Sequence, residues 1–403
     1  MNLHMLKSRS PLLVGLLITL TTISPAQTSD IVCPGSWKQV RNSGPPPNYS
    51  FALAFEPRGS HGHVLLFGGS DQRSNRKGDT WTWDGTVWIH AGDAGPSPRS
   101  DPAMAYDIAQ NRMVLFGGTG TPGNRYEENQ DTWEWDGTKW TQVGASGGPP
   151  ARSGHGMAYD GVRKKVVLFG GGVTFVGTIF NDTWEWDGTA WSQRSPALAP
   201  SLRESFGIAY DSSHARTVLF GGHFCCDPKD FGDTWTWDGT VWTQVSTTGP
   251  GVRNAPAMTY DSARHRTILF GGSGGASFFG DTWEWDGVSW TQVATTGPAP
   301  RSASKMTYDK ARGKTVLFGG STDTVLIQDT WEWRGPIYGC SSRAAGDLNC
   351  DHLVNHQDLT IVDAALGLPA CSAADPRDLN HDGKINAQDA QLLANKCTKL
   401  GCK

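Results

Sequence analysis

Short apolar segments alternate with polar turns at regular intervals along most of the chain. In 301–320 the apolar "MTYD" is followed by the turn "ARGK" and then by "TVLFGG", and in 281–293 "DTWEW" is followed by Asp-Gly and "VSWTQV". The period of two in these segments indicates β-strands with both Trp of "WEW" on one face and the Glu on the other. Asp-Gly tolerates the positive φ of a tight hairpin. The pattern predicts four short antiparallel strands per unit, with packed tryptophans and solvated glutamates.

The same unit occurs six times. The "FGG" triplet begins at Phe67, Phe116, Phe169, Phe220, Phe270 and Phe318. The "DTW" triplet begins at Asp79, Asp131, Asp182, Asp233, Asp281 and Asp329. Four antiparallel strands repeated about every 50 residues are typical of a β-propeller. The unit "R-S…MxYD…VLFGG…DTWxWDGTxW" resembles the Kelch repeat over residues 36–338. This resemblance implies a mainly β fold, a six-bladed Kelch-type propeller of the galactose-oxidase-like superfamily.

The sixth unit lacks its third tryptophan. Of the 18 Trp, five units have three each, the sixth has Trp331 and Trp333, and Trp37 in "GSWKQV" is the one left over. We therefore expect an N-terminal strand around Trp37 to close the last blade, which removes an exposed sheet edge. The alternative is that Tyr338, five residues after Trp333, lies in an outer strand of the sixth unit's own. The closed arrangement brings the two chain ends together and predicts a Cys33–Cys340 disulfide.

The N-terminal 26 residues have the pattern of a secretory signal peptide. Lys7 and Arg9 precede an apolar segment at 11–23, and Ser24-Pro25-Ala26 supplies small residues at a cleavage site. We expect a secreted protein, extracellular or at the cell surface, and the resemblances point to a bacterial source. All eight Cys follow this segment, and an even count in an exported chain favours disulfides. The net charge of −4 predicts no nucleic-acid partner, and no other segment is apolar enough to span a membrane.

Two twelve-residue acidic segments follow the sixth unit, "DLNCDHLVNHQD" at 347–358 and "DLNHDGKINAQD" at 378–389. Each places oxygen ligands at the spacing of a calcium loop. The expected ligands are Asp347, Asn349, Asp351, Leu353 through its carbonyl, Asn355 and Asp358 in the first loop, and Asp378, Asn380, Asp382, Lys384 through its carbonyl, Asn386 and Asp389 in the second. His352 replaces the usual Gly at the sixth position, so the first site is expected to be the weaker one.

A single helix is expected after each loop, and this tandem pattern resembles the type I dockerin domain over 346–397. The resemblance implies two calcium ions and a cohesin-like partner. His356-Gln357 and Ala387-Gln388 occupy the positions that resemble the recognition sites, and they lack the small hydroxyl residues common there. Four cysteines lie in this part, and the sequence leaves three pairings open among them: Cys350, Cys371, Cys397 and Cys402. The expected organisation is a signal peptide at 1–26, a propeller at 27–340, a linker at 341–346 and a dockerin-like domain at 347–403.

The loops between the second and third strands vary most, and we expect them on the same face as the starts of the inner strands. Ligands commonly bind to loops held by a rigid scaffold. The candidate ligand-binding residues on this face are Arg99, Arg152, Arg203, Arg253, Arg301, Tyr126, His155, Phe175 and His223. The alternative for the repeated arginines is that each pairs with the Asp of "DTW" and fixes its own blade. Cys225 and Cys226 are expected to form a vicinal disulfide, the alternative being a metal site with His223 and Asp227.

These features favour a non-catalytic recognition or scaffold protein. The propeller would bind a polysaccharide or an extracellular protein, and the dockerin-like module would bind calcium and tether the chain to a partner. The alternative is an extracellular carbohydrate-active enzyme, either a glycoside hydrolase or a galactose-oxidase-like copper oxidase. The sequence shows neither a Tyr–Cys–His copper set nor a pair of acidic residues that breaks the repeat.

Overall fold

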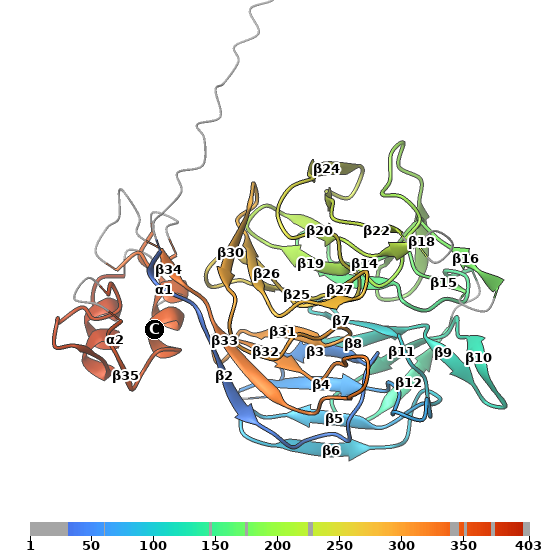
Figure 1. Cartoon of the computed structure of the whole chain (residues 1–403), viewed down its shortest axis with the longest axis horizontal. Coiled ribbons are helices and arrows are strands. Elements are labelled where there is room, and N and C mark those ends of the chain that lie inside the picture. Colours follow the sequence, from blue (N-terminus) through green and yellow to red (C-terminus); the bar gives the residue numbers. More distant parts are fainter. Residues whose placement is uncertain are drawn as a thin grey trace, which may run out of the picture.

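The computed structural model describes residues 31–59, 61–144, 147–173, 176–224, 229–338, 346–349, 353–371 and 375–397. Six four-stranded antiparallel sheets surround a central axis, and a small domain with two helices lies beside them (Figure 1). The predicted signal peptide and the pair Cys225 and Cys226 lie outside the described residues. No helix in the described ranges is both long and apolar enough to cross a membrane.

Each sheet forms one blade, and its four strands follow one another from the axis outward. Blades 1 to 3 are β3 (Ala52–Glu56), β4 (His63–Phe67), β5 (Thr80–Trp83) and β6 (Trp88–Gly92); β7 (Ala103–Asp107), β8 (Arg112–Phe116), β11 (Thr132–Trp135) and β12 (Trp140–Val143); β13 (Gly156–Asp160), β14 (Lys165–Phe169), β17 (Thr183–Trp186) and β18 (Trp191–Arg194). Blades 4 to 6 are β19 (Gly207–Asp211), β20 (Arg216–Phe220), β23 (Thr234–Trp237) and β24 (Trp242–Ser246); β25 (Ala257–Asp261), β26 (Arg266–Phe270), β29 (Thr282–Trp285) and β30 (Trp290–Ala294); β31 (Lys305–Asp309), β32 (Lys314–Phe318), β33 (Thr330–Arg334) and β2 (Ser36–Arg41).

The two ends of the propeller differ in their connections. The loops between second and third strands lie at one end, which we call the loop face. Four of them form small hairpins: β9 (Thr119–Thr121) with β10 (Asn124–Glu128), β15 (Gly172–Val173) with β16 (Thr178–Ile179), β21 (His223–Phe224) with β22 (Lys229–Asp230), and β27 (Ser273–Gly274) with β28 (Ser277–Phe278). The opposite end, the turn face, carries the short turns after the inner strands and the Asp-Gly hairpins.

The last blade is closed by the N-terminal strand, as predicted. In the β2–β33 pair Trp37 lies opposite Trp333, and the Trp37 indole N–H donates to Thr282 Oγ1 of blade 5 at 2.8 Å. Trp191 makes the same bond to Thr132 of the preceding blade at 2.9 Å. The alternative, in which Tyr338 lies in an outer strand of the sixth unit's own, is wrong, because β34 (Ile337–Tyr338) pairs with β1 (Ile31–Cys33) instead.

The core lies between neighbouring blades, where apolar side chains of adjacent sheets interlock. Six large tryptophans are at most 2% exposed: Trp83, Trp186, Trp237, Trp242, Trp285 and Trp333. The prediction of solvated "WEW" glutamates is wrong for Glu185, Glu284 and Glu332, which are buried and form ion pairs with Arg163, Arg264 and Arg312. These arginines lie in the turn after the inner strand of the same blade. The repeat therefore buries a paired charge beside its tryptophans.

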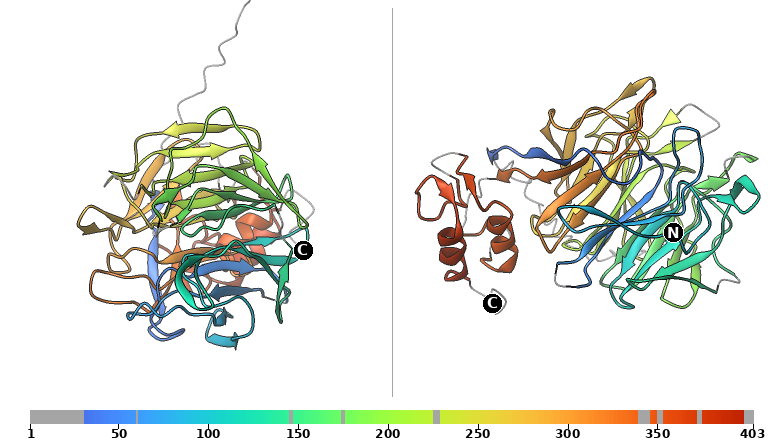
Figure 2. Two further views of the ribbon diagram at one scale, coloured as in Figure 1. Left: turned by 90° about the vertical axis from the view of Figure 1, so that its right-hand side faces the viewer. Right: turned by 90° about the horizontal axis from the view of Figure 1, so that it is seen from below.

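The small domain holds α1 (His356–Asp363), α2 (Ala387–Ala394) and a two-residue ladder of β35 (Leu368–Pro369) with β36 (Lys384–Ile385). A capping box starts each helix, with Asn355 and Asn386 as the N-caps. Leu348, Val354, Ile361 and Leu393 form its core together with three propeller residues from blades 5 and 6 and the segment that follows, namely Ala263, Tyr308 and Ile337. The domain therefore packs against the turn-face side of those blades (Figure 2).

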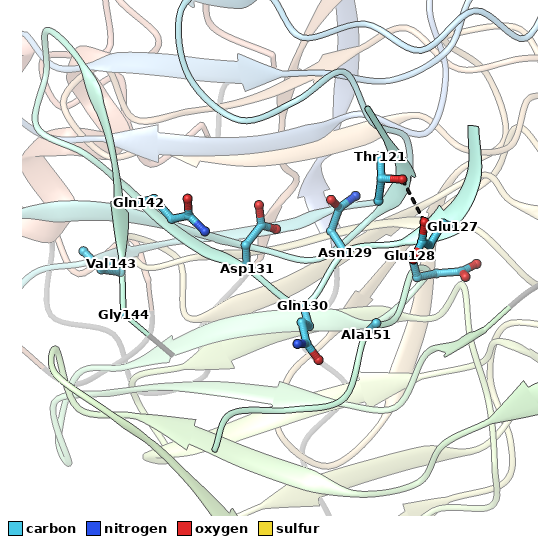
Figure 3. A pocket seen from close by; sticks show the side chains of 10 residues that line it. All are labelled: Thr121, Glu127, Glu128, Asn129, Gln130, Asp131, Gln142, Val143, Gly144 and Ala151. Carbon is cyan, nitrogen blue, oxygen red and sulfur yellow. Dashed lines mark hydrogen bonds between the residues drawn. The ribbon is translucent and has the colours of Figure 1, made fainter. Parts of the chain in front are cut away.

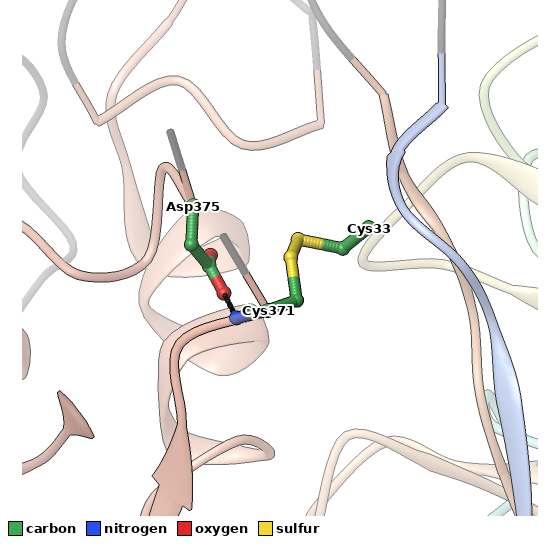
Figure 4. Close-up of side chains that lie close together, drawn as sticks. All are labelled: Cys33, Cys371 and Asp375. Atoms are coloured by element: carbon green, nitrogen blue, oxygen red, sulfur yellow. Dashed lines mark hydrogen bonds between the residues drawn. A yellow bond between two sulfur atoms is a disulfide. The ribbon is translucent and has the colours of Figure 1, made fainter. Parts of the chain in front are cut away.

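A disulfide joins the N-terminal segment to the small domain. Cys33 is bonded to Cys371, and the Cys371 N–H donates to Asp375 Oδ2 at 2.9 Å (Figure 4). The predicted Cys33–Cys340 disulfide is therefore wrong, and Cys340 itself lies outside the described residues. Cys371 is likewise not paired within its own domain, although all three predicted pairings required a partner there. The bond forms because β1 continues past the closed blade to the docked domain.

Candidate functional site

The loop face gathers the starts of the six inner strands and the variable loops, as predicted. Each segment that leads into an inner strand forms a β-bridge with the residue that follows "FGG" in its own blade, for example Ser100 with Thr119 and Glu204 with His223. In each blade the bridge places the start of the variable loop beside the segment that leads into the inner strand. Side chains on them therefore surround the mouth of the central channel.

The repeated arginines lie inside this layer rather than on its surface. Arg152 is 0% exposed, and its two terminal nitrogens contact Asp182 Oδ1 and Oδ2 at 2.6 and 2.8 Å, while Nη1 also donates to the Gly170 carbonyl at 2.9 Å. The same bidentate pairing joins the other four arginines to the Asp of their own "DTW": Arg99–Asp131, Arg203–Asp233, Arg253–Asp281 and Arg301–Asp329. These are the blade-fixing contacts that the sequence offered as the alternative. The five guanidinium groups are thus not available to a ligand.

Blade 1 has Asn48 in place of the arginine. The Asn48 Nδ2 donates to the Gly68 carbonyl at 2.6 Å, which preserves one bond of the motif. Its side chain is too short to form the bidentate pair, and the equivalent Asp79 is held by the indole N–H of Trp81 at 2.6 Å. The first blade, which meets the spliced last blade, therefore lacks the internal ion pair of the other five.

The other predicted ligand residues are spread over the face. Tyr126 projects from the β9–β10 hairpin and is 57% exposed, with the Arg125 guanidinium 5.2 Å from its ring. His223 Nδ1 lies 3.0 Å from Asp230 Oδ1, and Asn254 Nδ2 donates to the same oxygen. His155 is buried with its ring edge-to-face against Phe116. Phe175 lies outside the described residues. The structure therefore brings none of these side chains together into one set.

A ring of backbone hydrogen bonds surrounds the mouth of the channel. In each blade the third residue before the Met or equivalent residue of the inner strand has a positive φ: Ser50, Asp101, Gly154, Ser205, Ala255 and Ala303. From Asp101 to Ala303, the N–H of each of these residues donates to the carbonyl of its counterpart in the preceding blade, at 2.6 to 3.1 Å across five successive blade pairs. A non-glycine residue with positive φ is uncommon, and such strain persists where surrounding structure enforces it. The ring fixes the geometry of the mouth.

Three charged side chains break the repeat at this mouth, and the sequence patterns did not single them out. Burial raises the pKa of Asp101, although Ser50 and Lys305 favour its ionised form. Burial also raises the pKa of Glu204, and Asp101 adds to that rise. Burial lowers the pKa of Lys305, and Asp101 opposes this shift. Clustered groups with shifted pKa values are typical of functional sites. Aligning the six units residue by residue reveals each as the odd member of its column.

The channel narrows below the mouth. Lys305 and His155 line a cavity of about 90 Å³ there. Its floor is a ring of one large apolar residue from each blade: Leu53, Met104, Met157, Ile208, Met258 and Met306. Beyond this ring a second cavity, of about 280 Å³, opens toward the turn face and is lined by the aromatic residue of each inner strand. The apolar ring thus separates the polar cavity on the loop-face side from the cavity lined by aromatic residues on the turn-face side.

A broader polar cleft lies farther from the axis, between blade 2 and the start of blade 3 (Figure 3). Its volume is about 690 Å³, and its lining is rich in amide and carboxylate side chains: Glu127, Glu128, Asn129, Gln130 and Gln142. Thr121 Oγ1 donates to Glu127 Oε2 at 3.0 Å across the hairpin, and Asn129 Nδ2 donates to the Gly118 and Gly120 carbonyls. These hydrogen bonds fix the conformation of the β9–β10 hairpin beside the cleft.

The small domain is held on the other side of the propeller by specific contacts. Arg334 Nη2 donates to the Ala364 carbonyl at 2.8 Å, and Gln357 Nε2 donates to the Ser262 carbonyl at 3.4 Å. Ser262 lies in the turn after the inner strand of blade 5, and Arg334 ends the third strand of blade 6 at the turn face. Gln357 is one of the predicted recognition residues, so the first helix turns this position toward the propeller. Ala387 and Gln388 of the second helix are exposed.

The predicted calcium ligands in the described residues offer hard oxygens on two tightly curled loops. Asp389 Oδ1 accepts from the Leu379 N–H at 2.7 Å and Oδ2 from the Asn386 N–H at 2.9 Å, and Asp358 closes the first loop in the same way. Burial raises the pKa of Asp358 to about 6, and Asp347 adds to the shift. An all-oxygen donor set that includes a buried carboxylate suits Ca²⁺. Asp351 and His352 lie outside the described residues.

A different trio could be taken for a metal site. Among the described His, Cys, Asp and Glu side chains, only those of Cys33, Cys371 and Asp375 bring three possible ligand atoms within 4.8 Å of one another. The two sulfurs are joined in the disulfide, so neither is a thiolate ligand. Asp375 is paired with Arg377 at 2.8 Å. The trio is therefore a structural staple.

Known families match two parts of the chain. Residues 162–334 match the KLHDC2/KLHL20/DRC7 Kelch-repeats domain, and residues 345–397 match the dockerin type I domain. An F-box/kelch-repeat protein of Arabidopsis thaliana is 32% identical over 167 residues, covering 37% of this chain and 32% of that protein. The flagellar outer-arm dynein alpha chain of Chlamydomonas reinhardtii is 29% identical over 137 residues, covering 32% of this chain and 3% of that protein. The chain thus spans at most about a third of these relatives.

A solved structure has the same fold. The structure of YjhT superimposes with a TM-score of 0.57 at 15% identity, covering 72% of this chain and 96% of that one. At this identity the likeness bears on architecture alone. The dockerin type I match spans the two acidic loops and the helix after each of them.

Proposed function

Because the chain is a six-bladed Kelch-repeat β-propeller joined to a dockerin type I domain, we propose that it is a secreted recognition protein. In this proposal the propeller binds a polysaccharide or an extracellular protein through its loop face. The dockerin domain binds two calcium ions and tethers the chain to a cohesin-like partner on a cell surface or in an extracellular assembly. A disulfide between distant segments supports export, because such bonds persist in oxidising compartments.

One observation carries the proposal: the variable loops and the dockerin domain lie at opposite faces of one rigid propeller. The ligand clefts are on the loop face, whereas the domain contacts the turn face through Ser262 and Arg334. The Cys33–Cys371 disulfide fixes this arrangement covalently. A tether on one side leaves the other side open to a large ligand, which is the geometry that a recognition module of an assembly requires.

The cleft of Figure 3 favours a hydroxyl-rich ligand. Its amide and carboxylate groups can donate to and accept from hydroxyl groups, and the exposed Tyr126 ring at the nearby hairpin provides a stacking surface. A cleft of about 690 Å³ has room for more than one sugar unit, since ligand pockets for small molecules span roughly 300–1,000 Å³. A polysaccharide is therefore the ligand that this surface suits best.

Calcium would be held by the carboxylate and amide oxygens of 347–358 and 378–389 together with the carbonyls of Leu353 and Lys384. Bound calcium supplies positive charge that neutralises the clustered carboxylates and cross-links each loop. The chain's own part is to pre-form the loops: Asp358 and Asp389 cap them, and Asn355 and Asn386 start the helices that follow. Metal binding and folding of this small domain are thus coupled.

A second candidate function is glycoside hydrolysis, favoured by Asp101 and Glu204. Both carboxyl groups lie at the channel mouth, and the pKa of each is raised by burial, as expected of a general acid. Release of reducing sugar by the wild type and its loss in Glu204→Gln would support this function. Retention of the polysaccharide without any turnover would exclude it and leave recognition.

The experiment that tests recognition is affinity electrophoresis of the full chain in gels that contain soluble polysaccharides, repeated with Gln142→Ala. The matched control is Gln244→Ala, the same position of the outer strand in blade 4, which is exposed but lies outside the cleft. We expect one or more polysaccharides to retard the wild type and the control, and retardation to weaken in Gln142→Ala. No retardation by any polysaccharide would overturn the polysaccharide part of the proposal.

A further inference from the structure

We propose that the mouth of the central channel binds the terminal unit of a neutral saccharide chain, through Lys305, Asp101 and Glu204. This inference rests on the proposed function, because it takes a saccharide as the ligand of the loop face. It adds a second binding site, which lies at the channel axis and is separate from the cleft between blades 2 and 3. This second site accepts only the terminal sugar unit of a saccharide chain.

Lys305 is the first feature that points to a site. Its counterparts in the other five blades are small: Ala52, Ala103, Gly156, Gly207 and Ala257. Within the described part of the chain the Lys305 ammonium has no hydrogen bond or ion pair of ordinary length, although its side chain lines the 90 Å³ cavity. A lysine of this length in place of Ala or Gly brings three free N–H donors into the channel. A repeat that works with Ala at this position has no structural need for the lysine.

Asp101 is the second feature. It belongs to the hydrogen-bonded ring, with φ 53°, where Ser50 and Ser205 occupy the same conformation at 58° and 54°. Its N–H donates to the Ser50 carbonyl at 2.6 Å and its carbonyl accepts from Gly154. The backbone of Asp101 is therefore fixed on both sides, and its carboxylate interacts with the charge of Lys305.

Glu204 completes the acceptors. Its side chain lies over Gly154, since a Cβ placed on that glycine would be 3.2 Å from the Glu204 Cβ and 3.4 Å from Oε2. Any larger residue at Gly154 would displace the carboxylate. Four of the five counterparts of Glu204 are small or neutral polar residues: Ser100, Ser153, Asn254 and Ser302. The Glu204 side chain thus occupies space that is free because residue 154 of the neighbouring blade is glycine.

His155 gives an independent indication that this cavity takes a polar ligand. The side chain lines the same cavity, is 7% exposed, and neither ring nitrogen has a hydrogen-bond partner in the described ranges. A buried polar group without a partner is costly, and natural proteins retain few of them. Equivalent positions hold Phe51 and Phe206, which would pack there without that cost.

The mixture of charges selects the class of ligand. The carboxylates of Asp101 and Glu204 would repel an anion, and the Lys305 ammonium would offset part of their attraction for a cation. A hydroxyl group donates to a carboxylate and accepts from an ammonium, so a neutral polyol satisfies both. The cavity volume of about 90 Å³ is about that of three water molecules in the liquid. A cavity of this size has room for the edge of one sugar ring but not for a continuous chain. The apolar ring of Met104 and its counterparts closes the floor, so a chain can enter only by its end.

The repeat supplies variants that should fold. Lys305→Ala copies Ala52, Ala103 and Ala257, and Glu204→Ser copies Ser100, Ser153 and Ser302. Lys310→Ala is the matched control, because it removes the same charge from an exposed position of the same blade at the turn face. The probes are neutral cello-, xylo- and mannotriose, and the measurements are isothermal titration calorimetry and Tm of the full-length protein.

We expect at least one neutral trisaccharide to bind the wild type and Lys310→Ala alike, with affinity lower by about tenfold or more in Lys305→Ala and Glu204→Ser. The Tm of Lys305→Ala should rise, because the half-buried lysine serves a ligand rather than the fold. Unchanged trisaccharide affinity in both mouth variants, with loss in Gln142→Ala, would overturn the channel site and leave the proposed function intact. Absence of binding to every trisaccharide and polysaccharide would overturn both. A large fall in Tm of Lys305→Ala would show that the lysine is structural.

Discussion

Closure of the sixth blade by the N-terminal strand can be tested at Trp37. The substitution Trp37→Phe keeps an aromatic ring and removes the indole N–H. Trp37 donates to Thr282 Oγ1 at 2.8 Å, and its ring centroid lies 5.2 Å from those of Phe270 and Trp333. The matched variant is Trp191→Phe, which removes the equivalent bond to Thr132 from a blade made of consecutive strands.

The expected cost follows from what each ring contributes. Loss of a neutral hydrogen bond costs about 1 kcal/mol, and the smaller ring gives up roughly another 1 kcal/mol of packing. The free energy of unfolding should therefore fall by about 1–2.5 kcal/mol in Trp37→Phe. Trp191 is more deeply buried than Trp37, so the cost of Trp191→Phe should lie at the upper end of that range.

Differential scanning calorimetry measures the effect directly. At about 2–4 °C per kcal/mol for domains of 150–250 residues, and less for longer ones, both variants should lower the Tm of the propeller by a few degrees. Loss of stability in Trp191→Phe with Trp37→Phe within about 0.5 kcal/mol of the wild type would refute the closure, since that range is typical of a surface position.

The calcium loops, the disulfide and the blade ion pairs give three more predictions. Chelation of calcium should lower the Tm of the dockerin domain while the propeller transition remains, and identical scans with and without chelator would contradict the calcium sites. Cys371→Ser opens a loop with a sequence separation of 338 residues and should cost at most about 6 kcal/mol in the chain-entropy model, with faster hydrogen exchange in α1; unchanged exchange would show that the disulfide adds nothing to docking. Burial alone would raise the pKa of Asp131, Asp233 and Asp281, but the paired arginines reverse this and hold each pKa below its usual value. The stability that these pairs contribute is present above about pH 4 and is lost as the pH falls. The free energy of unfolding should therefore fall less steeply with decreasing pH in Asp131→Asn than in the wild type, and equal slopes would contradict this role of the pair.

Much of the fold could be predicted because the repeat is redundant. Six copies of "FGG" and "DTW" fix the strands and their number, and the leftover Trp37 identifies the closing strand. The two acidic loops and the helix after each of them could be predicted in the same way, since their spacing is local. In each case the pattern that matters lies within one unit or one loop.

The features that sequence reasoning missed arise between units or between domains. Cys371 finds Cys33 because the dockerin domain docks beside β1, and no spacing along the chain reveals that approach. The glutamates of "WEW" look solvated by their period of two, yet arginines from the adjoining turn neutralise Glu185 and Glu284 inside the blade. The repeated arginines resemble ligand-binding residues because they are charged and regular. Regularity in fact indicates a role in the blade, whereas Lys305, Asp101 and Glu204 stand out only when they break it.

Hydrogen exchange measured by mass spectrometry on the full-length protein, with and without a bound saccharide, tests the central claim that ligands bind at the face opposite the dockerin domain. We predict that protection concentrates in loop-face peptides, around Arg99–Thr121, Glu204 and Lys305, while peptides of α1 and of the turns near Ser262 and Gly313 keep their exchange rates. Protection confined to the turn face or to α2 would contradict the account.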